Sequence, residues 1–130
     1  MIEFNTVPKI SIDLRPGLYL LTPLSATGKT YLASVLQQLH NLGESVVAYT
    51  YTDFQKHVDL DRLVTERGCS VLLLDRYGMY NGDESIVRVA LRVAKQGVVL
   101  IDVKAADVPG IPGCRYADIT LSPDRIEVSE

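Results

Sequence analysis

The chain has 130 residues, of which 47% are hydrophobic and 22% are charged, and its formal net charge is −3 at pH 7. This balance predicts one ordinary globular domain over residues 1–130. It excludes a disordered chain and a strongly basic nucleic-acid coat, so a nucleic-acid partner is not indicated.

Several sequence features bear on location and on metals. No apolar run approaches the ~18–20 residues that a helix needs to cross a bilayer, so no membrane partner is expected. The N-terminus has acidic Glu3 early and no continuous apolar core, unlike a secretory signal. Cys69 and Cys114 form no CxxC pair, and neither histidine has ligand spacing with them, so we expect no zinc site. The simplest interpretation is a soluble, reduced, cytoplasmic protein.

The N-terminal part of the chain predicts strands. Two short extended pieces separated by Pro8 are expected between Ile2 and Leu14, where alternating apolar residues indicate a strand with one buried face. A Pro-Gly turn then leads into Leu18–Leu21, a continuous apolar run typical of a strand covered on both faces.

A small-residue loop and a helix come next. The loop covers Pro23–Gly28, and from Lys29 the apolar residues fall at helical spacing up to a C-terminal cap at Gly43. The apolar stripe of this helix consists of Leu32, Val35, Leu36, Leu39 and Leu42.

The middle of the chain alternates strand and helix. Ser45–Thr52 is rich in Val and Tyr and predicts a strand. Asp53 or Asp59 is expected to cap a helix that ends at Gly68. Val71–Asp75 predicts a third apolar strand.

The C-terminal part continues this alternation and ends in a hairpin. Asn81–Gln96 predicts a helix that stops before Gly97, and Val98–Val103 predicts a fourth apolar strand. Ala105–Arg115 is expected to be a loop with two prolines, and Tyr116–Val128 a strand, a turn and a closing strand.

Apolar strands that alternate with amphipathic helices predict an α/β domain: a three-layer sandwich with a mostly parallel sheet, plus terminal antiparallel strands. In such sheets, ligands bind at the carboxyl ends of the strands. We therefore expect three loops to gather at one edge: Pro23–Gly28, Asp53–Lys56 and Asp75–Glu84.

The strongest functional signal is the order of strand, small-residue loop and helix around Gly28-Lys29-Thr30. These residues match the last positions of GxxxxGK[ST], although Pro23 occupies the position of the first glycine and lacks an N–H. In this motif, backbone N–H groups bind phosphate oxygens, Lys29 would neutralise the β- and γ-phosphates, and the Thr30 hydroxyl would ligate Mg²⁺.

On these residues the chain resembles the P-loop NTPase superfamily, as a minimal ABC- or RecA-like ATPase core with a degenerate Walker A motif. The resemblance covers about Leu18 to Val128. It implies that residues 1–130 form a single nucleotide-binding domain of the P-loop type, with ATP and Mg²⁺ as cofactors. The implied nucleotide-binding residues are Pro23, Leu24, Ser25, Ala26, Thr27, Gly28, Lys29, Thr30 and Tyr31.

The resemblance also implies a Walker B aspartate. Val71–Asp75 has four apolar residues followed by an acid, and Val98–Asp102 has the same pattern. Order along the chain favours Asp75 as the Mg²⁺ ligand beside Thr30. Asp102 is then expected to cap a neighbouring strand or to reach the γ-phosphate.

No obvious catalytic base follows Asp75. Many such ATPases have a glutamate at the next position, where this chain has Arg76, which cannot accept a proton at neutral pH. The candidate catalytic residues are Lys29, Asp53 and Asp75, and Asp53 is the candidate catalytic acid. Asp83 and Glu84 are other acids that could serve. For Asp53, Asp83 and Glu84, helix capping is the commoner use.

These observations predict an ATP-binding protein with weak or partner-dependent Mg-ATPase activity. The alternative is a degenerate P-loop domain that serves as a binding or assembly module without hydrolysis. GTP is disfavoured because 102–105 does not fit a guanine motif, and a homo-oligomer or a protein partner is left open. Tyr51, Tyr77 and Tyr80 could line the ligand edge, although strand and rim positions are more common for tyrosines.

Overall fold

The predicted N-terminal strands are present in the computed structural model, which describes residues 1–6, 8–21, 26–80, 83–102 and 113–130, with the backbone alone for residues 26–30 and 67. They are β1 (Ile2–Phe4), β2 (Lys9–Asp13) and β3 (Gly17–Leu21). In β2, Ile10 and Ile12 are fully buried and Asp13 is exposed, as the alternation indicates, but Ser11 between the isoleucines is buried as well.

The helix after the predicted phosphate loop is α1 (Ala26–Asn41). Its apolar stripe is buried as predicted, except that Leu42 lies beyond the end of the helix and is 74% exposed. The chain turns away at Gly43, whose φ of +94° favours glycine. In the part of the chain that the structure describes, no helix is both long enough and apolar enough to span a bilayer.

The second predicted strand ends earlier than expected. It is β4 (Val46–Tyr49), and Thr50 caps the short helix α2 (Tyr51–Gln55), so extending the strand to Thr52 was wrong. The next helix, α3 (Leu60–Arg67), is capped by Asp59 and ends at a left-handed Gly68, as predicted.

A short 3₁₀ helix lies between the third strand and the helix that comes next in the chain. They are β5 (Val71–Leu74), the short 3₁₀ helix η2 (Tyr77–Met79) and α4 (Glu84–Val93). The last helix starts after its cap, Asp83, because this aspartate binds the first-turn N–H groups, and it ends at Val93, so it is shorter than the predicted Asn81–Gln96 at both ends.

The remaining strands are β6 (Val98–Ile101), β7 (Arg115–Ser122) and β8 (Arg125–Ser129). The predicted C-terminal hairpin is confirmed, because β7 and β8 pair antiparallel. Most of the predicted loop Ala105–Arg115 lies outside the described residues.

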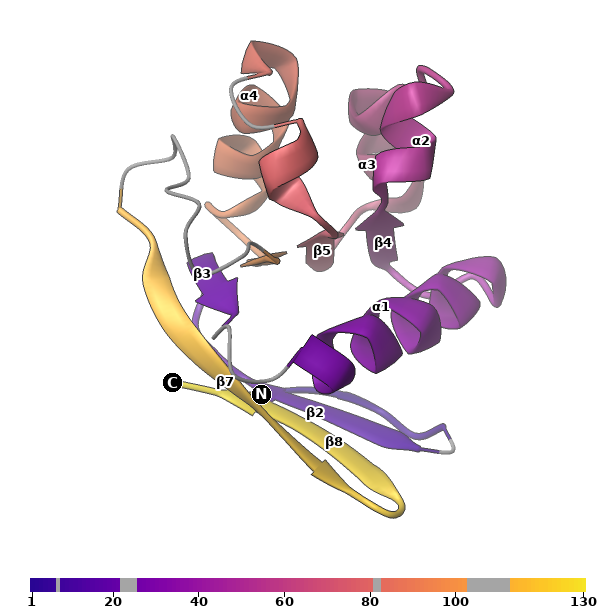
Figure 1. The fold of residues 1–130 in the computed structure, drawn as a ribbon, viewed down its shortest axis with the longest axis vertical. Coiled ribbons are helices and arrows are strands. Elements are labelled where there is room, and N and C mark those ends of the chain that lie inside the picture. The colour runs from indigo at the N-terminus through magenta and orange to yellow at the C-terminus, as the bar shows by residue number, and fades with distance from the viewer. Residues whose placement is uncertain (7, 22–25, 81–82, 103–112) are drawn as a thin grey trace.

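The prediction of a three-layer sandwich with a mostly parallel sheet of the P-loop NTPase type is wrong. All strands join one mixed, eight-stranded sheet in the order β1-β2-β8-β7-β3-β6-β5-β4, and this sheet curves into a half-barrel (Figure 1). The strands β7, β3, β6, β5 and β4 run parallel, whereas β8 is antiparallel to β7 and β1 is antiparallel to β2.

The physical reason for this difference lies in β7. Its first residues, Arg115–Ala117, pair with β3, whereas Asp118–Ser122 pair with β8. The terminal strands are therefore a continuation of the central sheet, and β8 also pairs with β2 over Lys9–Asp13. In β7 and β8 buried and exposed residues alternate, so in this half of the sheet a single face is covered.

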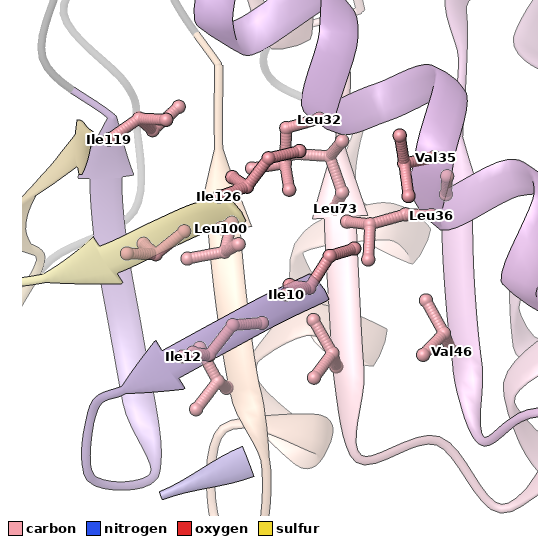
Figure 2. Packing of buried hydrophobic residues seen from close by; sticks show 14 of the residues in the cluster. Ile10, Ile12, Leu32, Val35, Leu36, Val46, Leu73, Leu100, Ile119 and Ile126 are labelled. Carbon is pink, nitrogen blue, oxygen red and sulfur yellow. The ribbon is translucent and has the colours of Figure 1, made fainter. Parts of the chain in front are cut away.

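The curved sheet encloses α1. Figure 1 shows α1 between β4 and β5 on one side and the band of β2, β7 and β8 on the other, with α3 and α4 beyond β4 and β5. Leu32 and Leu36 of α1 pack in one buried cluster with residues of both parts of the sheet (Figure 2). The labelled sheet residues of this cluster are Ile10, Ile12, Val46, Leu73, Leu100, Ile119 and Ile126.

Gly97 yields a stability prediction. A Cβ at Gly97 would lie 2.8 Å from the backbone oxygen of Ser70, which accepts the hydrogen bond from Val98 N. Since this oxygen belongs to the junction of β5 and β6, Gly97→Ala is expected to lower the free energy of unfolding by about 1–3 kcal/mol. Urea unfolding measures the effect, and the exposed Gln96→Ala serves as control. Equal stability of the two variants would contradict the predicted clash.

Asp83 yields a pH prediction. Hydrogen bonds from the Ser85 side chain and from the N–H groups of Ile86 and Ser85 hold the pKa of Asp83 below its ordinary value. The folded pKa is thus lower than the unfolded one, so the stabilisation is present above about pH 4 and disappears as the pH falls through the folded pKa.

Accordingly, Asp83→Ala should cost about 1 kcal/mol of stability at neutral pH, because α4 loses its cap. The difference from wild type should shrink in acid, and it is measured by urea unfolding between about pH 7 and pH 2. Asp83→Asn keeps a capping oxygen and is the control. A constant difference between wild type and the alanine variant at every pH would contradict the assignment.

Candidate functional site

The carboxyl ends of three parallel strands meet at one edge of the sheet. Thr50, Asp75 and Asp102 directly follow β4, β5 and β6. They line a cavity of about 390 Å³ together with Arg76 and one flank of α1. The α1 residues in this lining are Ala33, Ser34, Gln37 and Gln38. The structure thus brings Asp75 and Asp102, both singled out by sequence, into one polar cavity.

The predicted phosphate-binding residues are described only in part. Pro23, Leu24 and Ser25 lie outside the described residues. Residues 26–30, which include Lys29 and Thr30, form the first turns of α1, so the predicted loop Pro23–Gly28 was wrong for residues 26–28, which already belong to the helix. Tyr31 is 43% exposed on the same helix and is not part of the cavity lining.

Asp75 sits on a backbone that is held from two sides. Its N–H donates to the carbonyl oxygen of Tyr49 at 2.9 Å, which continues the ladder between β4 and β5. Its own carbonyl oxygen accepts from the Tyr80 hydroxyl at 2.6 Å. The position of this half-buried residue is therefore set by β4 and by the chain that follows η2.

Asp102 is held in a similar way. Its N–H donates to the Leu74 carbonyl oxygen at 3.0 Å, and its carbonyl oxygen accepts from Tyr77 N at 2.8 Å. The peptides of both aspartates are thus tied to neighbouring segments. Carboxylates on such a rigid support are suited to hold a ligand in a fixed place.

Arg76 has an unusual backbone. Its φ of 52° and ψ of 46° lie in the left-handed region, which costs a residue other than glycine about 1–2 kcal/mol. The exposed side chain lines the cavity beside Asp75 and Asp102. The positively charged Arg76 therefore lies near the two aspartates, at the chain position where many ATPases have a catalytic glutamate.

Asp53, the candidate catalytic acid, takes part in a capping box. Its carboxylate accepts from Thr50 N at 3.0 Å, and its own N–H donates to the Thr50 hydroxyl at 3.1 Å. Asp53 is not part of the cavity lining, whereas Thr50 is. Its role as a catalytic acid stays a prediction, and the capping role is the one that the geometry describes.

The tyrosines proposed for the ligand edge have other places. Tyr77 and Tyr80 are only 0% and 3% exposed, and Tyr51 is half-buried. The Tyr80 ring stacks on Phe54 and meets Tyr49 and Tyr77 edge to face. Tyr77 and Tyr80 therefore belong to a buried aromatic cluster and are neither the strand residues nor the rim residues that the sequence analysis had favoured.

Some of the cavity residues escaped the sequence analysis. Thr50 was placed inside a strand, although the spacing Thr50-x-x-Asp53 is that of a capping box. Gln37 and Gln38 flank the apolar stripe of α1 and gave no signal beyond their polarity. Among the residues that the structure describes, no group of three or more His, Cys, Asp or Glu could hold a metal ion.

Comparison of the chain with protein-family models, with curated proteins and with solved structures finds no match. What the cavity binds is therefore inferred from its own residues.

The left-handed backbone at Arg76 leads to a prediction. Arg76→Gly should relieve the strain of about 1–2 kcal/mol, partly offset by the greater freedom of glycine in the unfolded chain, for a net gain of about 0.5–1 kcal/mol. Arg76→Ala removes the same side-chain atoms but keeps the strain, and is the control. Thermal unfolding compares the two variants. A glycine variant no more stable than the alanine variant would contradict a left-handed Arg76.

Proposed function

We propose that this protein binds ATP together with Mg²⁺ in the cytoplasm, in the cavity between α1 and the carboxyl edge of β4, β5 and β6. One observation carries the proposal: Asp75 and Asp102 line one cavity with the helix that begins Ala26-Thr27-Gly28-Lys29-Thr30. Carboxylates can hold the cation of a magnesium nucleotide, and a helix N-terminus can bind its phosphates.

The periodicity of α1 supports this assignment. The cavity is lined by Ala33, Ser34 and Gln37 of the helix. Positions 30, 33, 34 and 37 share one face of an α-helix, because they are spaced by three or four residues. Position 30 therefore lies on the cavity-lining face, one turn before Ala33.

The chemistry of these residue types fits a magnesium nucleotide. Carboxylate and hydroxyl oxygens are hard ligands, and Mg²⁺ is usually held by one or two carboxylates plus the phosphates of the substrate. Asp75 and Thr30 would hold the cation, and Lys29 would bind the β- and γ-phosphates. When bound, Mg²⁺ would neutralise part of the charge of these phosphates.

Hydrolysis is proposed to be weak or to depend on a partner. Arg76 follows Asp75 and cannot accept a proton from water at neutral pH. The carboxylate of Asp53 is engaged at the N-terminus of α2. Without a positioned base, a nucleotide can bind while the attack by water stays slow, so a second protein or another copy of the chain would complete the site.

The second candidate is a binding or assembly module that does not hydrolyse nucleotide. Arg76 favours this function because a cation replaces the expected base, and Pro23 favours it because a proline removes one N–H from the loop. Release of inorganic phosphate from ATP, measured with and without a protein lysate, distinguishes the candidates. Release in neither condition, with nucleotide still bound, supports the module.

Nucleotide binding is tested by thermal unfolding. ATP with Mg²⁺ at about 100 times Kd should stabilise the protein by about 2.7 kcal/mol, or roughly 10 °C in Tm. Lys29→Ala should abolish the shift, and Asp75→Asn should remove the part that depends on Mg²⁺. Lys95→Ala, an exposed lysine beyond α4, is the control and should keep the full shift. No shift of the wild type at millimolar ATP would overturn the proposal.

A further inference from the structure

The Tyr80 hydroxyl connects the ends of two neighbouring strands. It lies 2.6 Å from the carbonyl oxygen of Asp75 and 3.3 Å from that of Tyr49. Asp75 directly follows β5 and Tyr49 is the last residue of β4, and Asp75 N also donates to the Tyr49 carbonyl oxygen. The buried Tyr80 hydroxyl therefore contacts the two carbonyl oxygens at the end of the hydrogen-bond ladder between β4 and β5.

The Tyr80 ring is fixed by its neighbours. Its centroid lies 5.2 Å from that of Phe54 in a stacked pair, and 5.9 and 5.5 Å from those of Tyr49 and Tyr77 in edge-to-face pairs. Burial, followed by the nearby charge of Asp75, raises the pKa of Tyr80 far above its ordinary value. The stacked and edge-to-face neighbours thus fix the ring from which the hydroxyl reaches the Asp75 and Tyr49 carbonyl oxygens.

This hydroxyl closes a tight reversal of the chain after Asp75. The backbone turns through the left-handed Arg76 and η2, and Tyr80 then donates back to the Asp75 carbonyl oxygen. The turn is also tied to β6, because Tyr77 N donates to the Asp102 carbonyl oxygen. Both sides of the Asp75 peptide are held, so its carboxylate starts from a fixed backbone.

We propose that Tyr80 is a positioning residue for the cation of the nucleotide site: its hydroxyl holds the Asp75 backbone in place and thereby sets the affinity for Mg²⁺. The inference rests on the proposed binding of ATP with Mg²⁺ and adds a residue that does not touch either of them. Groups that orient a metal ligand without touching the metal typically matter for affinity: their removal lowers metal affinity about 10–100-fold.

The test is Tyr80→Phe, which keeps the ring and removes the hydroxyl. Two matched controls exist: Tyr49→Phe removes a hydroxyl of the same cluster that donates to the Val58 carbonyl oxygen, and Tyr19→Phe removes one that donates to the Arg15 carbonyl oxygen beside β3. Calorimetric titration measures Mg²⁺ affinity with ATP present, and ATP affinity in EDTA. Urea unfolding measures the stability of every variant.

Tyr80→Phe should lower the affinity for Mg²⁺ about 10-fold and leave the affinity for ATP in EDTA unchanged, while both controls match the wild type in each titration. If Tyr80→Phe binds Mg²⁺ as tightly as the wild type, the positioning role is overturned and ATP binding stays intact. The same holds if a control variant that loses as much stability as Tyr80→Phe also loses as much affinity for Mg²⁺. A wild-type protein that binds ATP equally with and without Mg²⁺ would overturn both proposals.

Discussion

The structure depends on the burial of one helix inside a curved sheet. Leu32 and Leu36 of α1 are fully buried, and their cluster includes residues from both the central strands and the terminal strands. Because the burial of these apolar surfaces is the main favourable term in folding, α1 holds the two parts of the half-barrel together. Its polar flank, with Ser34 and Gln37, is thereby brought to the carboxyl edge of the sheet.

Backbone hydrogen bonds organise the edge of the sheet. The peptides of Asp75 and Asp102 are tied to Tyr49, Leu74, Tyr77 and Tyr80. The aromatic cluster of Tyr49, Phe54, Tyr77 and Tyr80 packs next to these contacts. Asp75 and Asp102 line one cavity with Arg76, and under the proposed function such acids would hold a cation and the arginine would suit phosphate. The proposed binding of a magnesium nucleotide rests on this combination, whereas the proposed hydrolysis also needs a base that Arg76 cannot supply.

Local sequence signals predicted most elements of the fold. Asp59, Gly68 and the apolar stripe of α1 marked the helices, because caps and periodicity depend on residues a few positions apart. The strand prediction failed where a helix cap interrupts a run of residues that favour a strand. Thr50 and Asp53 form a capping box that ends β4 before Thr52, and the same box engages the acid that had been assigned to catalysis.

The arrangement of the sheet could not be predicted in this way. Alternation in β2, β7 and β8 indicated one buried face for each strand, but a period of two does not reveal which strands become neighbours. The parallel pairing of β2 with β8 joins the two ends of the chain. The change of partner within β7, from β3 to β8, then makes the sheet mixed and curved.

The sequence by itself determined most of the elements and their caps, because each depends on residues close in sequence, but it missed the short helices α2 and η2. Only the tertiary structure decided that Asp102 shares a cavity with Asp75 and that Tyr80 points inward to hold the Asp75 backbone. Both depend on which strands lie side by side, and that choice is made by burying apolar faces from distant parts of the chain.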